Sequence, residues 1–154
     1  MFSFLLIVHG LCAVALLGAL THQAISVLWP AHRRTGSFVS SLRSVPSMTY
    51  TDAIIVLFIV TAILGSIIYT EYRITIRITL QDYRLRVPEG AFELKEHVLA
   101  IGLGLLPAYW HYWRPALAKE FASTRVIVTS LLAAIVWYAF LTGHVLNDIR
   151  GFGS

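Results

Sequence analysis

The sequence predicts an all-α integral membrane protein whose four helices form a single bundle over residues 1–154. Hydrophobic residues make up 57% of the chain and charged residues only 13%, and the mean hydropathy is +0.72, which is too apolar for a soluble domain of this length. Four apolar stretches have the length that a helix needs to cross a hydrocarbon core of about 30 Å. They cover residues 2–29, 53–72, 93–113 and 126–146.

The first span is predicted to be a retained helix and not a cleaved signal peptide. It starts at Met1 without a positively charged segment, is longer than a signal-peptide core, and lacks a small-residue cleavage site. Cys12 is the single cysteine of the chain, so the sequence has no disulfide framework and no CxxC motif. The following stretch, residues 30–50, is rich in Ser, Arg and Pro, as is typical of a surface connection.

The second span is followed by alternating apolar and polar residues over 71–87, which fit either an extended segment or a continuation of the helix. Pro88 and Glu89 indicate the first turn of the third helix, because Pro and acidic residues are favoured there. Arg114 and Pro115 mark its other end. Aromatic residues at the ends of the spans are predicted to be interface anchors, namely Trp29, Trp110, Tyr112 and Trp113.

The net charge of +4 is predicted to reflect membrane topology and contact with anionic lipid, not binding of nucleic acid. Four spans place both termini on one side of the membrane. The 12 Lys and Arg residues divide equally between the two sides, whereas acidic residues gather in 71–96 on the side of the termini. We expect a bacterial inner-membrane protein with periplasmic termini.

Histidines inside the spans are the strongest functional signal, because ionisable residues at membrane depth are rare and costly. His9 and His22 lie in the first span, and His97 and His111 lie in the third. These two spans run in the same direction, and each pair straddles the middle of its span. At 1.5 Å per residue, the two members of a pair are about 20 Å apart along the helix.

Helical periodicity predicts which of these residues share a face of their helix. A spacing of fourteen places His97 and His111 on nearly one face, with Gly104 midway between them, where a flat ring could approach the backbone. The spacing of thirteen turns His22 about 140° from His9 on an ideal helix. Either the first helix is distorted, or one of its histidines has another role. His144 in the fourth span has a depth similar to His9 and His97.

Together, His9, His22, His97, His111 and Gly104 resemble the pattern of transmembrane dihaem b-type cytochromes. The resemblance implies bis-histidine haems, with His9 and His97 (or His144 as a substitute) on the side of the termini and His22 and His111 on the other. It implies a non-catalytic subunit that carries electrons across the membrane through one or two haems, between quinone and a partner within a larger redox complex. Arg114 is a candidate to bind a haem propionate.

Two other functions fit the sequence. Glu93 and His97 share a helical face and, with His9 or His144, provide nitrogen and oxygen ligands suited to a transition metal. Alternatively, the chain is a cofactor-free anchor or scaffold for other subunits of a membrane complex. No arrangement of residues indicates hydrolysis or phosphate binding.

Overall fold

A computed structural model describes residues 2–29, 47–78, 86–117 and 120–151. Four long helices dominate it, namely α1 (Phe2–Leu28), α3 (Thr51–Glu71), α5 (Arg86–Tyr112) and α6 (Ala122–Gly151). Three short elements flank them: η1 (Ser47–Tyr50), the π-helix η2 (Tyr72–Ile76) and η3 (Pro115–Leu117). The described ranges contain no strand, so the predicted all-α, four-helix fold is confirmed.

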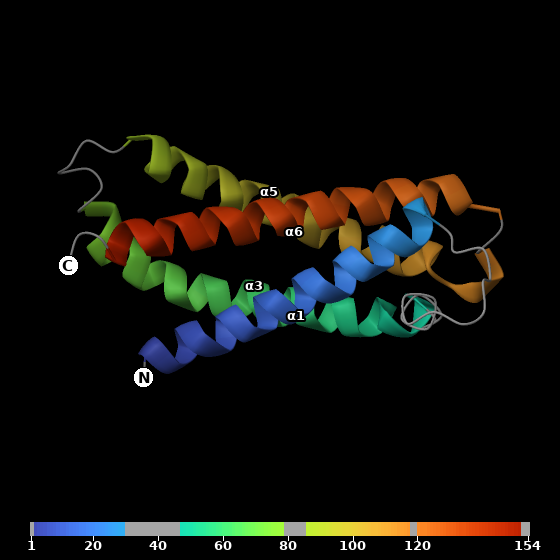
Figure 1. The fold of residues 1–154 in the computed structure, drawn as a ribbon, viewed down its shortest axis with the longest axis horizontal. Helices are drawn as coiled ribbons and strands as arrows, with labels where there is room; N and C mark the ends of the chain where they lie inside the picture. Colours follow the sequence, from blue (N-terminus) through green and yellow to red (C-terminus); the bar gives the residue numbers. More distant parts are fainter. Residues whose placement is uncertain (1, 30–46, 79–85, 118–119, 152–154) are drawn as a thin grey trace.

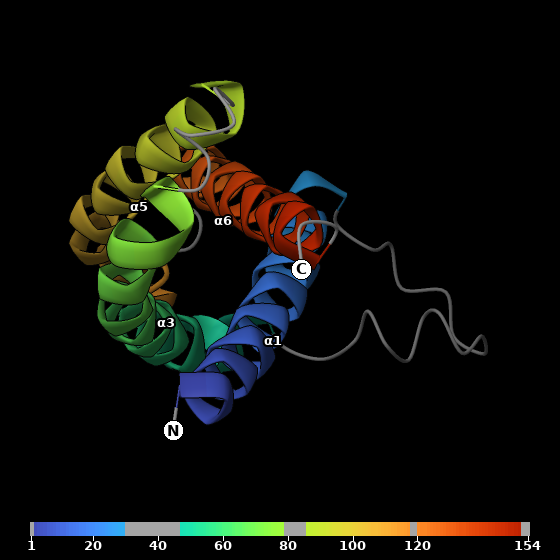
Figure 2. The same cartoon turned by 90° about the vertical axis from the view of Figure 1, so that its left-hand side faces the viewer.

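The four helices form an up-and-down bundle (Figure 1). α1 and α5 run in one direction, and α3 and α6 run in the other. Viewed from one end, the order around the bundle is α1, α3, α5, α6, with the main contacts between neighbours in this order (Figure 2). The start of α1 and the end of α6 lie together at one end, which we call the termini end; the opposite end is the far end.

Three helices are long and apolar enough to cross a membrane: Ser3–Leu28, Met48–Ile74 and Ala122–Val145. The predicted span 93–113 is helical but does not meet the same measure. The physical reason is its composition, since α5 begins with charged residues such as Glu89 and Lys95 and ends with Pro107 and His111. It lies beside α6 and α3 along the bundle.

The ambiguous stretch after the second span continues as helix. α3 passes into the π-helix η2, and residues 77–78 are again helical. α5 begins at Arg86, two residues before Pro88, so the predicted start is nearly correct. The predicted surface connection at 30–46 and the residues 79–85 lie outside the described ranges.

The apolar core fills only the far half of the bundle. Every member of its buried cluster lies in the half of its helix nearer the far end: Leu16, Leu20, Ala24, Ile54, Phe58, Leu106, Tyr109, Trp113, Val128, Leu132, Ala133 and Val136. Among the residues whose burial is described, the buried apolar side chains of the termini half are Tyr72 and Phe92. The outer surface is apolar, with exposed residues such as Phe4, Ile59 and Leu131, as suits contact with lipid.

Candidate functional site

His9 faces the interior of the termini half. It lies seven and eleven residues before the buried Leu16 and Leu20, which places all three on one face of α1. The imidazole packs on Gly65 of α3, where an added Cβ would lie 3.2 Å from His9 Cε1. The imidazole interacts with the backbone of Thr61, while its buried Nδ1 atom has no hydrogen-bond partner among the described residues. Such a buried polar atom points to a missing partner, such as water or a ligand.

Other polar side chains of this half also lack hydrogen-bond partners or carry charge. Thr61 Oγ1, near His9, is buried without a hydrogen-bond partner in the described part of the chain, and so is Tyr72 Oη nearer the termini end of the same half. Lys95 Nζ lies 3.0 Å from Glu96 Oε1, and the charges of both act on His9. Among the described residues, the interior of the termini half therefore contains polar groups and few buried apolar side chains.

Gly143 of α6 indicates further open space in this half. It lies seven residues after the buried Val136, so the two residues share the inward face of α6. Nothing lies within 4 Å of the position of an added Cβ.

His144 lies on the side of α6 that turns towards α1. Seven residues earlier, Trp137 donates its indole N–H to Thr21 Oγ1 of α1 at 3.0 Å. A spacing of seven keeps His144 on that side of the helix. The exposed imidazole stacks on Phe140, with ring centroids 6.3 Å apart. His144 and His9 therefore belong to neighbouring helices, although Thr21, which marks the side of α1 that meets α6, lies about 120° from His9 around α1.

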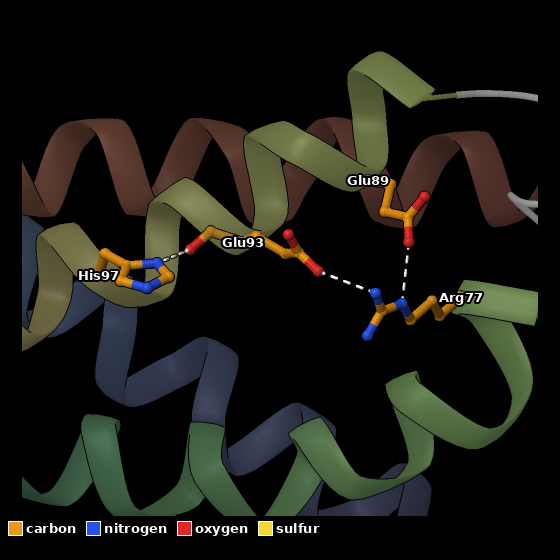
Figure 3. A network of polar contacts seen from close by, with 4 residues as sticks. All are labelled: Arg77, Glu89, Glu93 and His97. Atoms are coloured by element: carbon orange, nitrogen blue, oxygen red, sulfur yellow. Dashed lines mark hydrogen bonds and ion pairs between the residues drawn. The ribbon is translucent and has the colours of Figure 1, made fainter.

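His97, Gly104 and His111 share one exposed face of α5, as the periodicity predicts. That face points away from the bundle interior. Gly102 lies two residues from Gly104, about 200° around the helix, and an added Cβ there would lie 2.6 Å from Phe58 of α3. His97 Nδ1 donates to the carbonyl oxygen of Glu93, one turn earlier in the same helix, at 2.7 Å (Figure 3). The structure does not bring His97 to His9 or His111 to His22.

The far half holds a buried hydrogen-bond network in the region between His22 and α5. Tyr109 donates its hydroxyl to Gln23 Oε1, and Gln23 Nε2 donates to Thr51 Oγ1 at 3.3 Å. All three residues are buried, and they join α5, α1 and α3. His22 is half-buried and packs edge-on against Tyr50, with ring centroids 5.5 Å apart. Packed side chains thus occupy the interior at this depth.

Sequence reasoning missed this network and misplaced one aromatic residue. The one sequence feature that could have indicated the network is Gln23 itself, a single amide side chain in an apolar span.

Trp113 is not an interface anchor, because it is only 4% exposed and donates its N–H to Thr129 Oγ1 of α6 at 2.9 Å. Trp29 and Trp110 are 68% and 45% exposed, as anchors are. Arg114 is exposed, with its guanidinium 3.8 Å from the centre of the Trp110 ring.

At the termini end, an ion-pair network connects the end of η2 to α5 (Figure 3). Arg77 Nε donates to Glu89 Oε1 at 2.8 Å, and its Nη2 lies 3.1 Å from Glu93 Oε1. The hydrogen bond to Glu89 raises the pKa of Arg77, so this guanidinium stays charged. Beside the network, Tyr72 stacks on Phe92 with centroids 3.8 Å apart.

The alternative metal site gains no support from this arrangement. Glu93 is engaged by Arg77, and the Nδ1 atom of His97 is engaged by its own helix. Within the described ranges, no three His, Cys, Asp or Glu side chains come together as metal ligands.

No protein-family model, curated protein or solved structure matches this chain. The fold and the site define an all-α membrane bundle whose described apolar core lies in its far half and whose termini half holds the inward-facing His9 with few buried apolar side chains.

Proposed function

We propose that this chain is a membrane electron-transfer subunit that binds one b-type haem in the termini half of its bundle, with His9 and His144 as the axial ligands. The observation that carries the proposal is the setting of His9. Its imidazole faces inward beside Gly65, with a buried Nδ1 that has no partner among the described residues, in the half where Tyr72 and Phe92 are the buried apolar side chains among the residues whose burial is described. A haem is large, flat and mostly apolar, and would fill this half.

We choose His144 as the second ligand because of the direction in which each candidate histidine faces. His144 belongs to the side of α6 that contacts α1, whereas His97 belongs to the outward face of α5. His22 and His111 are set aside as a second pair because the buried network of Gln23 and Tyr109 occupies the interior between their helices. We therefore favour one haem, not two.

The chain's residues would hold and position the group, and the bound haem would supply reversible one-electron chemistry. Gly143 leaves room next to the backbone of α6, and Gly65 makes room for the His9 ring itself. Lys95 and Arg77 lie at this end, where they pair with Glu96 and with Glu89 and Glu93, so a propionate would have to compete with these carboxylates for a cation. The neighbouring redox carriers would be quinone and other subunits of a complex in a bacterial cytoplasmic membrane.

Matched histidine variants test the ligand assignment. Purified protein would be examined by reduced-minus-oxidised optical spectra and by haem extraction. His9→Ala and His144→Ala are expected to abolish haem binding, whereas His97→Ala and His111→Ala retain it. Haem loss in His97→Ala or His111→Ala with retention in His9→Ala would overturn the assignment. Absence of haem from protein isolated out of its native membrane would leave a cofactor-free scaffold as the better description.

A further inference from the structure

The outward face of α5 is unlike the outward faces of the other three long helices. Six of its exposed residues form a stripe at helical spacing, beside exposed apolar residues such as Leu94 and Ile101: Glu93, His97, Ala100, Gly104, Pro107 and His111. α5 is also the long helix that is not apolar enough to count as a membrane span. Imidazoles and a carboxylate facing hydrocarbon are costly. A protein surface that pairs with these groups would remove that cost.

Small residues at the middle of the stripe permit a close approach by another helix. Ala100 and Gly104 are four residues apart and both exposed, which is the small-xxx-small pattern of packed membrane helices. Nothing lies within 4 Å of the position of an added Cβ on Gly104. A partner helix could therefore lie against the α5 backbone at this point.

The charges and histidines of the stripe are arranged around Gly104. His97 and His111 lie seven residues before and after it. Towards the termini end, Glu93 shares the single charge of Arg77 with Glu89, so these three side chains together carry one net negative charge. Towards the far end, Arg114 is exposed. A second α5 in the opposite direction would place Glu93 near Arg114, whereas a parallel copy would oppose like charges.

The inverted pairing also opposes each His97 to His111 of the second copy. Because Nδ1 of His97 donates to the Glu93 carbonyl, Nε2 is left as an acceptor in the neutral imidazole. A donor nitrogen on the facing imidazole would satisfy it. The polar groups of both stripes would then be covered together.

The distribution of basic residues allows both orientations in a membrane. The excess of Lys and Arg on one side normally sets orientation, and acidic residues contribute little. Here the 12 basic residues divide into six and six. In the sequence, six of them belong to residues 71–96 and the C-terminal segment (Arg73, Arg77, Arg84, Arg86, Lys95 and Arg150), and six belong to residues 30–50 and 114–125 (Arg33, Arg34, Arg43, Arg114, Lys119 and Arg125).

We propose that a second, inverted copy of this chain docks on the outward face of α5, so that the protein inserts in both orientations and forms an antiparallel dimer centred on Gly104. The proposal differs from the expectation that both termini are periplasmic, because it places the termini on both sides of the membrane. This dimer does not depend on the haem proposal, because its contact face is opposite to the side of α5 that faces the interior.

Disulfide cross-linking in membranes distinguishes the possible partners. In a Cys12→Ser background, Ala100→Cys and Ala108→Cys leave the charges and histidines of the stripe unchanged. Antiparallel copies place residue 100 opposite residue 108, so the double variant is expected to form dimers on mild oxidation at least five times more efficiently than either single variant. Equal cross-linking by Ala100→Cys alone indicates a parallel pair and overturns the proposal. Absence of cross-links in the double variant and in Gly104→Cys also overturns it.

A matched pair of lysine variants tests the orientation directly. Ser3→Lys and Ser123→Lys each add one positive charge at the second residue of a helix, at the termini end and at the far end respectively. Each alone is expected to fix one orientation and to reduce the cross-linking of the cysteine pair several-fold, whereas coexpression of the two restores it. Undiminished cross-linking in both separate variants would contradict insertion in two orientations.

Discussion

His9 of α1 and Gly65 of α3 are in contact across the helix interface, and the glycine makes room for the imidazole. An added Cβ on Gly65 would lie 3.2 Å from His9 Cε1 and 3.9 Å from Nδ1. The position of the imidazole is therefore sensitive to one methyl group on the neighbouring helix.

Gly65→Ala is expected to displace the His9 ring by a few tenths of an ångström and to weaken haem binding. A cost of about 1 kcal/mol corresponds to a roughly five-fold loss of affinity. Haem titration of the apoprotein measures the effect. Gly18→Ala, where nothing lies within 4 Å of the added Cβ, is the control and should bind haem like the parent chain. Equal affinities for the two variants would argue against a role of His9 as a ligand.

Tyr109→Phe removes the hydroxyl that donates to the buried Gln23. We expect a loss of about 1 kcal/mol in unfolding free energy, because the amide oxygen loses a partner in an apolar interior. Gln23→Leu should show a similar loss, and the double variant should lose less than the sum of the two. A double-mutant cycle in detergent unfolding checks this, and additive losses would show that the two side chains are not coupled.

Gly102 marks the closest approach of α5 to α3, since an added Cβ would lie 2.6 Å from Phe58 Cζ. Gly102→Ala is expected to destabilise the bundle by about 1–3 kcal/mol through overpacking. Thermal unfolding measures this. Gly104→Ala, two residues away on the exposed face, should leave the stability of the single chain unchanged. Phe58→Leu should recover part of the stability of Gly102→Ala; no recovery would mean that this contact is not the source of the loss.

Arg77→Gln is expected to loosen only the termini end. Its charge links η2 to Glu89 and Glu93 of α5, while the apolar core lies in the far half. Hydrogen exchange should become faster at residues 72–78. Protection around Leu132 and Ile54 should stay the same. Uniformly faster exchange throughout the bundle would show instead that this network supports the whole fold.

The helices and the shared face of His97, Gly104 and His111 were predictable, because both follow from apolar length and from 100° of rotation per residue. The direction in which that face points was not predictable, because periodicity shows which residues share a side of a helix but not which neighbouring helix they contact. Gly102 decides it, through a contact with Phe58 that is distant in sequence. The pairing of Tyr109 with Gln23 depends in the same way on tertiary packing. Trp113 was misplaced because an indole serves equally at an interface and in a core.

The most direct test of the central claim is the number of b haems per chain in protein purified from its native membrane, measured as pyridine haemochromogen against protein concentration. The setting of His9 in the termini half, which has few buried apolar side chains among the described residues, and the filled interior beside His22, predict one haem per chain. Two haems per chain would contradict the packed far half, and none would contradict the proposed electron-transfer function.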